Sequence, residues 1–279
     1  MATQPSTFIT IIDTTSVAAG DAVFAAIQNG EAAFLNVLPK GDQFAVLGYA
    51  AHPAAIYPPS GLAHADAASV AKATKALMDV SPAGDAADIA AAVGHAASLI
   101  PRGARTLLAG RNEATPPISS AANKPGQGCA SQIDTIGAGD HPPTAVLRAV
   151  SAATGGSYRA IAGAAEVEAF FFKGIEQTGT VLFEGTRNLS VSPVFGTAST
   201  DGGLVLAALW TADGPPADLP FTISIVQPNE EPWTKPPTYA NGGFVIFNLR
   251  DAEKGEWTFT FKQKDDAPAA TVHVLALTR

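Results

Sequence analysis

The chain has 279 residues, of which 47% are hydrophobic and only 15% are charged, and it contains a single cysteine. One cysteine excludes an intramolecular disulfide and a cysteine-rich zinc module, and the length suggests one large domain or two ordinary ones. The 17 basic and 25 acidic residues give a formal net charge of −8, so a nucleic-acid partner is not expected.

The first part of the chain alternates β-branched runs with amphipathic segments. Thr7 to Ile12 is typical of a buried strand, and Asp21 to Leu38 carries apolar residues at the spacings of a helix. Further strands are predicted at 43–49, 54–57, 105–108, 132–136 and 157–161, and further helices at 68–79, 85–99, 144–153 and from 166 onward. This alternation predicts an α/β domain with a doubly wound, mostly parallel sheet and sites at the carboxyl ends of its strands.

The composition changes in the last part of the chain, which contains all three tryptophans and many β-branched residues. Short strands separated by Gly- and Pro-rich turns are predicted at 181–184, 188–194, 204–211, 221–227, 243–249, 255–263 and 271–277. Such a series predicts an all-β domain, an antiparallel β-sandwich. We therefore expect two domains, at residues 1–178 and 179–279.

The tryptophans of the second part divide into two kinds. Trp257 alternates with threonines in its strand, so Trp257 and Trp210 are expected in the core. Trp233 and Tyr239 lie in a Pro-rich segment that is expected to be a loop, where an aromatic pair could contact a partner or a sugar. Packing over one end of the sandwich is the favoured alternative for this pair.

The order of several motifs in the first part resembles that of a von Willebrand factor A domain. Such a domain has a strand ending in an Asp-x-Ser-x-Ser motif, a turn before its third helix, two further strand-end motifs and a helix ending in Thr-Gly-Gly. The matching stretches are Asp13 to Val17, Gly84 to Ile89, Leu107 to Gly110, Thr135 to Gly139 and Thr154 to Tyr158.

The resemblance implies a site for a divalent cation, usually Mg²⁺, formed by oxygen ligands at the strand ends. Asp13 and Thr15 could serve, and Asp85 could compensate for lost ligands, but three of the family's five ligand positions carry no suitable oxygen. We therefore expect a degenerate site without Mg²⁺ or Ca²⁺, in which Asp13 and Thr15 cap the loop before the first helix. The lost positions are Val17, Ala87 and Gly110.

The second part resembles the β-rich domain that follows the von Willebrand A domain in the calcium-activated chloride-channel regulator family. Full members of that family carry a zinc-protease domain with a His-Glu-x-x-His motif, which this sequence lacks. The resemblance thus implies the interaction part of the family without its proteolytic part. The matching stretches are Leu204 to Trp210, Gly214 to Pro216, Ile223 to Asn229, Gly255 to Thr260 and Val272 to Leu277.

No catalytic arrangement is expected. Asp140 and His141 adjoin at a strand end but point in different directions, and Cys129 lacks the basic neighbours that would activate it. We expect a non-enzymatic interaction or adhesion module that binds a protein partner, with the polar loop 112–132 as a contact region. The alternative is a metal-dependent adhesin or carbohydrate-binding protein with a cation at Asp13, Thr15 and Asp85. The expected partner-binding residues are Asp13, Thr15, Asp85, Gly110, Trp233 and Tyr239.

The sequence indicates a soluble chain. No apolar run approaches the roughly 18 residues of a membrane span, so no such span is expected. No signal peptide is visible at the N-terminus, so the compartment stays open: the chain is either cytoplasmic or exported by a non-classical route.

Overall fold

The computed structural model describes residues 6–16, 22–84, 87–99, 104–111, 132–201, 203–212, 219–249 and 253–278. Its internal contacts divide the chain into two compact units, Met1–Leu35 with Lys40–Val167 and Asn36–Pro39 with Glu168–Arg279. The domain boundary between residues 178 and 179 stays a prediction.

The first unit is built on a mostly parallel sheet, which confirms the predicted fold class. Its strands are β1 (Thr7–Asp13), β2 (Gln43–Tyr49), β3 (Pro53–Tyr57), β4 (Ala63–His64), β5 (Arg105–Gly110), β6 (Gln132–Ala138) and β7 (Tyr158–Ile161). The order across the sheet is β3-β2-β1-β5-β6-β7, with β4 also beside β2. β3 and β4 pair with β2 in the antiparallel sense, and the other strand pairs described in this sheet are parallel.

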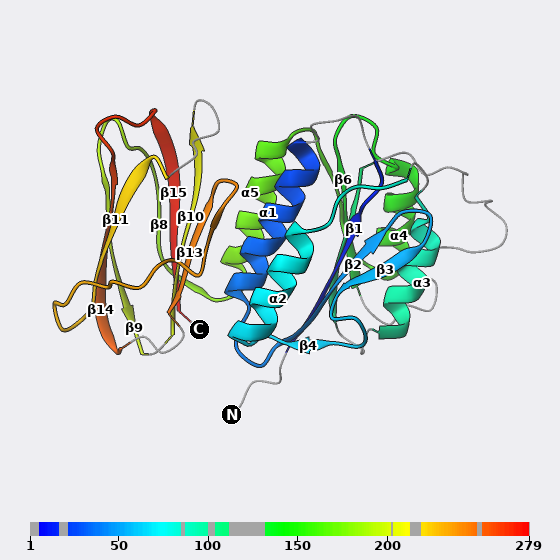
Figure 1. Ribbon diagram of the computed structural model, residues 1–279, viewed down its shortest axis with the longest axis horizontal. Helices are drawn as coiled ribbons and strands as arrows, with labels where there is room; N and C mark the ends of the chain where they lie inside the picture. The colour runs from blue at the N-terminus through cyan, green and yellow to red at the C-terminus, as the bar shows by residue number, and fades with distance from the viewer. Residues whose placement is uncertain are drawn as a thin grey trace. The chain divides into compact units, whose positions relative to one another are not determined.

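Helices cover both faces of this sheet, with α1 and α2 on one side and α3 and α4 on the other (Figure 1). Asp66 caps α2 by accepting a hydrogen bond from the Ser69 backbone N at 2.8 Å, and Gly155 ends α4 in the left-handed conformation. No described helix is long and apolar enough to cross a membrane. The helices are α1 (Ala22–Val37), α2 (Ala67–Met78), α3 (Ile89–Leu99), α4 (Thr144–Thr154) and α5 (Ala164–Glu176).

A hydrophobic core fixes α3 and α4 on the sheet. The strands contribute Ile9, Leu47, Leu108 and other aliphatic residues, all buried. Their helical partners are Ile89, Ala92, Val93, Ala96, Leu147 and Val150. The alternation of buried β-branched runs with amphipathic segments is what produces these layers.

The second unit contains two antiparallel sheets. Its strands are β8 (Thr180–Asn188), β9 (Val194–Thr200), β10 (Leu204–Ala212), β11 (Phe221–Val226), β12 (Tyr239–Asn241), β13 (Phe244–Leu249), β14 (Gly255–Gln263) and β15 (Ala270–Thr278). One sheet has the order β12-β13-β10-β15-β8 and the other β11-β14-β9.

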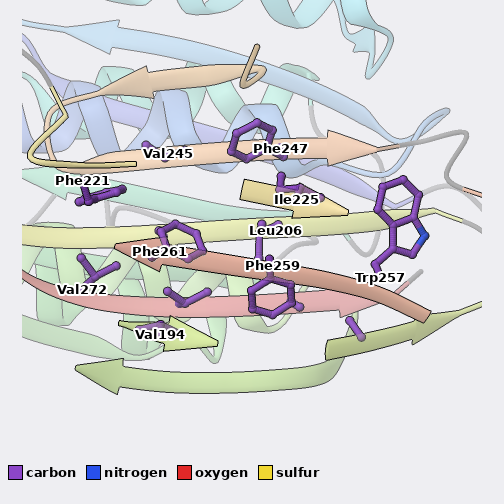
Figure 2. Packing of buried hydrophobic residues seen from close by; sticks show 14 of the residues in the cluster. Val194, Leu206, Phe221, Ile225, Val245, Phe247, Trp257, Phe259, Phe261 and Val272 are labelled. Atoms are coloured by element: carbon purple, nitrogen blue, oxygen red, sulfur yellow. The ribbon is translucent and has the colours of Figure 1, made fainter. Parts of the chain in front are cut away.

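One hydrophobic core lies between these two sheets (Figure 2). Trp257, Phe259 and Phe261 of β14 point into it from the smaller sheet, and Trp257 is 0% exposed. Leu206 and Val272 meet them from the larger sheet. The expected core position of Trp257 is confirmed, and its indole Nε1 donates to the Glu253 carbonyl oxygen at 2.9 Å.

The strand predicted at 188–194 is wrong. Residues 189–191 form a turn, in which the Asn188 side chain accepts a hydrogen bond from the Ser190 backbone N at 3.0 Å. The strand β9 starts at Val194 instead and alternates inward Val194, Gly196 and Ala198 with outward residues. Two of its core-facing residues, Gly196 and Ala198, are small, so the sequence shows no clear alternation of large apolar residues there.

Candidate functional site

The carboxyl ends of the central parallel strands meet at one edge of the first sheet. Asp13 pairs in register with Tyr49 of β2, and Gly110 of β5 pairs with Gly137 of β6. The ends of β1 and β5 are neighbours as well, because these two strands pair directly. Two of the predicted site positions, Asp13 and Gly110, are therefore brought to the same edge, as expected from the strand-end rule.

The Asp13 carboxylate is buried and bonded within the chain. Its Oδ1 accepts hydrogen bonds from the Thr15 backbone N at 2.9 Å and from Thr15 Oγ1 at 2.6 Å. Its Oδ2 accepts one from the Arg111 backbone N at 2.9 Å. Asp13 and Thr15 are both 0% exposed. Both oxygens of the Asp13 carboxylate thus accept hydrogen bonds from other groups of the chain.

Arg111, directly after β5, is the central side chain of this site and was not foreseen from the sequence. Its Nε donates to the Asp13 carbonyl oxygen at 3.2 Å and its Nη2 to the Thr15 carbonyl oxygen at 2.6 Å. The guanidinium carbon lies 4.6 Å from the ring centroid of Phe24, and the residue is only 4% exposed. Burial lowers the pKa of Arg111 while the Asp13 charge acts in the opposite direction, and a guanidinium stays protonated in such a site.

The position of Gly110 is tightly packed, so a larger residue there would have to displace its neighbours. A Cβ on Gly110 would lie 3.1 Å from Pro143 Cγ, 3.2 Å from Leu147 Cδ1 and 3.2 Å from the Tyr49 hydroxyl oxygen. Tyr49 is fully buried. This burial raises the pKa of the Tyr49 hydroxyl, and the nearby charge of Asp13 raises it further by a smaller amount. This packing fills the space with apolar and phenolic groups.

The described residues therefore do not fit a divalent cation at Asp13. A hard cation needs several accessible oxygen ligands, whereas Asp13 is 0% exposed with both oxygens bonded within the chain, and Ala87, which is buried, offers no oxygen in its side chain. Asp85 and Val17 lie outside the described residues, as do Cys129 and nearly all of the loop 112–132.

Backbone hydrogen bonds connect the loops around Asp13. The Thr14 N donates to the Tyr49 carbonyl at 2.8 Å, and Ala83 N to the Thr14 carbonyl at 2.8 Å. Ser16 N donates to the Gly84 carbonyl at 2.5 Å. We define the strand-end face by these exposed residues within the described parts of the loops: Ser16, Ala51, His52, Pro82, Ala83, Gly84, Asp140 and His141.

Trp233 and Tyr239 do not form an exposed loop pair. Tyr239 is the first residue of β12 and only 8% exposed, so its expected loop position is wrong. It is held there because β12 pairs with β13, a partner that the local sequence does not reveal. Trp233 is partly buried against the core of the second unit, 5.9 Å from the Trp257 ring, as the packing alternative predicted.

A separate group of possible metal ligands lies in the second unit. Oxygen or nitrogen atoms of Glu176, Glu184 and His273 lie within 4.8 Å of one another. Lys173 Nζ already donates a hydrogen bond to Glu176, and this bond is the largest of the causes that raise the pKa of Lys173. The group therefore contains a cation of its own, and we interpret it as an ion network.

Comparison with known proteins defines the fold of the chain. No protein-family model and no curated protein matches it. Among solved structures, it is similar to a von Willebrand factor type A protein from Catenulispora acidiphila, with a TM-score of 0.58 and 17% identity. That match covers 97% of this chain and 62% of the other, so this chain spans less than two thirds of the length of that structure.

Two further solved structures are similar at lower scores. The ArnB paralog VWA2 from Sulfolobus acidocaldarius has a TM-score of 0.47 and 12% identity over 100% of this chain and 67% of the other. The conserved hypothetical protein BatB from Bacteroides thetaiotaomicron has a TM-score of 0.47 and 11% identity over 62% of this chain and 99% of the other. The Catenulispora match shows a von Willebrand A-type fold. The resemblance of the second unit to the chloride-channel regulator family stays a prediction.

Proposed function

We propose that the chain is a non-enzymatic module that binds a protein partner at the strand-end face without a divalent cation. One observation carries this proposal: both oxygens of the Asp13 carboxylate accept hydrogen bonds from the chain itself. A carboxylate that is fully buried and bonded through both oxygens within the chain is poorly placed to hold a metal that would bridge to a partner. The von Willebrand A-type fold, which presents its loops at this edge, agrees with an interaction role.

The exposed side chains of the face supply the contact chemistry in this proposal. His52, Asp140 and His141 offer imidazole and carboxylate groups for hydrogen bonds and charge pairing. The loops that carry Ser16 and Gly84 are tied to each other by backbone hydrogen bonds. Backbone segments held by such a bond lose less conformational entropy on binding, which favours affinity.

The predicted partner-binding residues take different roles in this proposal. Asp13 and Thr15 have no exposed surface, so they shape the loops from below and do not touch the partner. Gly110 acts in the same indirect way, by leaving space for Tyr49 and Pro143. Asp85 lies outside the described residues, and its contact with a partner stays a prediction.

Affinity capture with paired variants tests the proposal. The face variant combines His52→Glu, which adds a negative charge, with Asp140→Arg, which reverses one, at two exposed positions. The control variant combines Lys72→Glu on α2 with Asp266→Arg in the turn before β15, two exposed positions off the face. We expect partners captured by the unmodified chain to be retained by the control and lost by the face variant, with or without chelator.

Two results would contradict the proposal. Partners retained by the face variant would place the interaction elsewhere on the chain. Loss of capture in the presence of chelator alone would favour the metal-dependent adhesin or carbohydrate-binding alternative.

A further inference from the structure

We propose that Arg111 is a built-in cation, which supplies at the strand ends the positive charge that a bound metal ion would otherwise provide. The proposal concerns the internal chemistry of the site and does not depend on any partner. It is therefore tested by stability and not by capture.

The first step of the argument is charge. A carboxylate with no exposed surface, such as that of Asp13, is unfavourable unless a positive charge and hydrogen bonds compensate for its lost hydration. Arg111 lies in the same buried site, and its guanidinium and the Asp13 carboxylate attract one another. The hydrogen bonds come from Thr15 and from the Arg111 backbone.

The second step is geometry. The Arg111 backbone N bonds the Asp13 carboxylate, while Nε and Nη2 of the same residue bond the carbonyl oxygens of Asp13 and Thr15. One residue thus ties the end of β5 to both sides of the loop that follows β1. The Phe24 ring of α1 covers the guanidinium, which is a favourable cation–π arrangement. The planar guanidinium makes these contacts with two of its nitrogen donors at once. A lysine ammonium is a compact point charge and cannot reproduce this geometry.

The third step is space. Gly110 brings the Tyr49 hydroxyl, Pro143 and Leu147 to within 3.2 Å of where a side chain would begin. The site is therefore packed around an arginine, with the second carboxylate of the family's motif replaced by a glycine that admits these neighbours. The charge of the site is balanced by one acid and one base of the same chain.

A double-mutant cycle on the full chain tests this inference. The variants are Asp13→Asn, Arg111→Met and the combination of the two, each compared with the unmodified chain by thermal unfolding. Each single change leaves one buried charge without its partner, so we expect each to lower Tm by roughly 10 °C or more. The combined variant removes both charges, and its Tm is expected to fall by clearly less than the sum of the single effects.

Arg111→Lys keeps the charge and changes the shape. Its Tm is expected between that of the unmodified chain and that of Arg111→Met. Strictly additive losses in the cycle, or equal Tm values for the Lys and Met variants, would overturn the inference, because the charge of Arg111 would then have no role.

A metal titration keeps the inference testable even where Arg111→Met fails to fold. We expect Mg²⁺, Ca²⁺ or Zn²⁺ to leave the Tm of the unmodified chain unchanged. A Tm increase that Asp13→Asn abolishes would overturn the inference, since Asp13 would then hold the ion. An increase that Asp13→Asn retains and His273→Ala abolishes would assign the ion to the Glu176, Glu184 and His273 group; the Asp13 site would then still be free of metal, as the inference requires.

Discussion

At the scale of single residues, Glu31 stands out because it is an acid inside the first unit. It lies on α1, is 1% exposed and is hydrogen-bonded to Thr10 of β1. Within the described part of the chain, its Oε2 has no hydrogen-bond partner. Burial raises the pKa of Glu31 from 4.5 to about 7, and the bond to Thr10 lowers it by a smaller amount.

The raised pKa predicts that Glu31 makes stability depend on pH. Below pH 4.5 the acid is protonated in both the folded and the unfolded chain, so no stability is lost. As the pH rises from 4.5 to about 7, the unfolded chain releases this proton while the folded chain keeps it, so the folded state loses stability. Above about pH 7 both states are ionised and the loss grows no further. Glu31→Gln cannot ionise, so relative to the unmodified chain it should gain up to about 3 kcal/mol between pH 5 and pH 8.

Urea unfolding at the two pH values measures this gain. Glu256→Gln, at an exposed position of β14, is the matched control and should show no such change. An offset between Glu31→Gln and the unmodified chain that is the same at pH 5 and pH 8 would show that Glu31 does not titrate in this range.

At the scale of elements, the paired strands β14 and β9 each carry a large aromatic residue, one facing the core and the other facing solvent. Trp257 of β14 is 0% exposed, whereas Phe195 of β9 is 68% exposed. Trp257→Ala should destabilise the second unit by about 3–5 kcal/mol because it opens a large cavity. Phe195→Ala should change stability by no more than about 0.5 kcal/mol. Denaturant unfolding followed by the fluorescence of Trp210 and Trp233 measures both, and similar losses would contradict the described core.

The elements also show what the sequence could predict. Long amphipathic or β-branched segments, such as Thr7–Asp13 and Ala22–Val37, carry their periodicity locally and were predicted within a few residues. β4 and β12 were missed because strands of 2 and 3 residues have no period to detect. β9 was missed because Gly196 and Ala198 face the core with hardly any side chain.

The candidate site was predictable only in part, because local sequence patterns do not show contacts between distant residues. Asp13 and Gly110 follow buried strands, so their meeting at one edge was expected from topology. The role of Arg111 depends on hydrogen bonds to Asp13, 98 positions away in the sequence. A local pattern contains no sign of such a contact, and an arginine after a strand is ordinarily a surface residue.

At the scale of the whole molecule, α5 raises the question of where the second unit begins along the chain. Phe172 of α5 is 2% exposed, and its ring lies 4.8 Å from that of His273 in β15. Both residues belong to the second unit. A fragment of residues 164–279 should therefore unfold several degrees above a fragment of residues 179–279, which lacks Phe172.

Circular dichroism on heating measures the two transitions. Phe172→Ala in the longer fragment should remove much of the difference, because the aromatic contact with His273 is then lost. Equal transition temperatures for the two fragments would instead support the boundary between residues 178 and 179.

The guanidinium of Arg111 differs from a bound metal ion in that it cannot leave the chain. A bound ion exchanges with the surrounding solution, so its occupancy follows supply, whereas a side chain is delivered once, during synthesis, in a fixed ratio of one to one. Under the inference that Arg111 takes the place of a metal ion, the charge balance around Asp13 would be set as soon as the first unit has folded. It would then be the same in a cell rich in divalent ions as in one depleted of them.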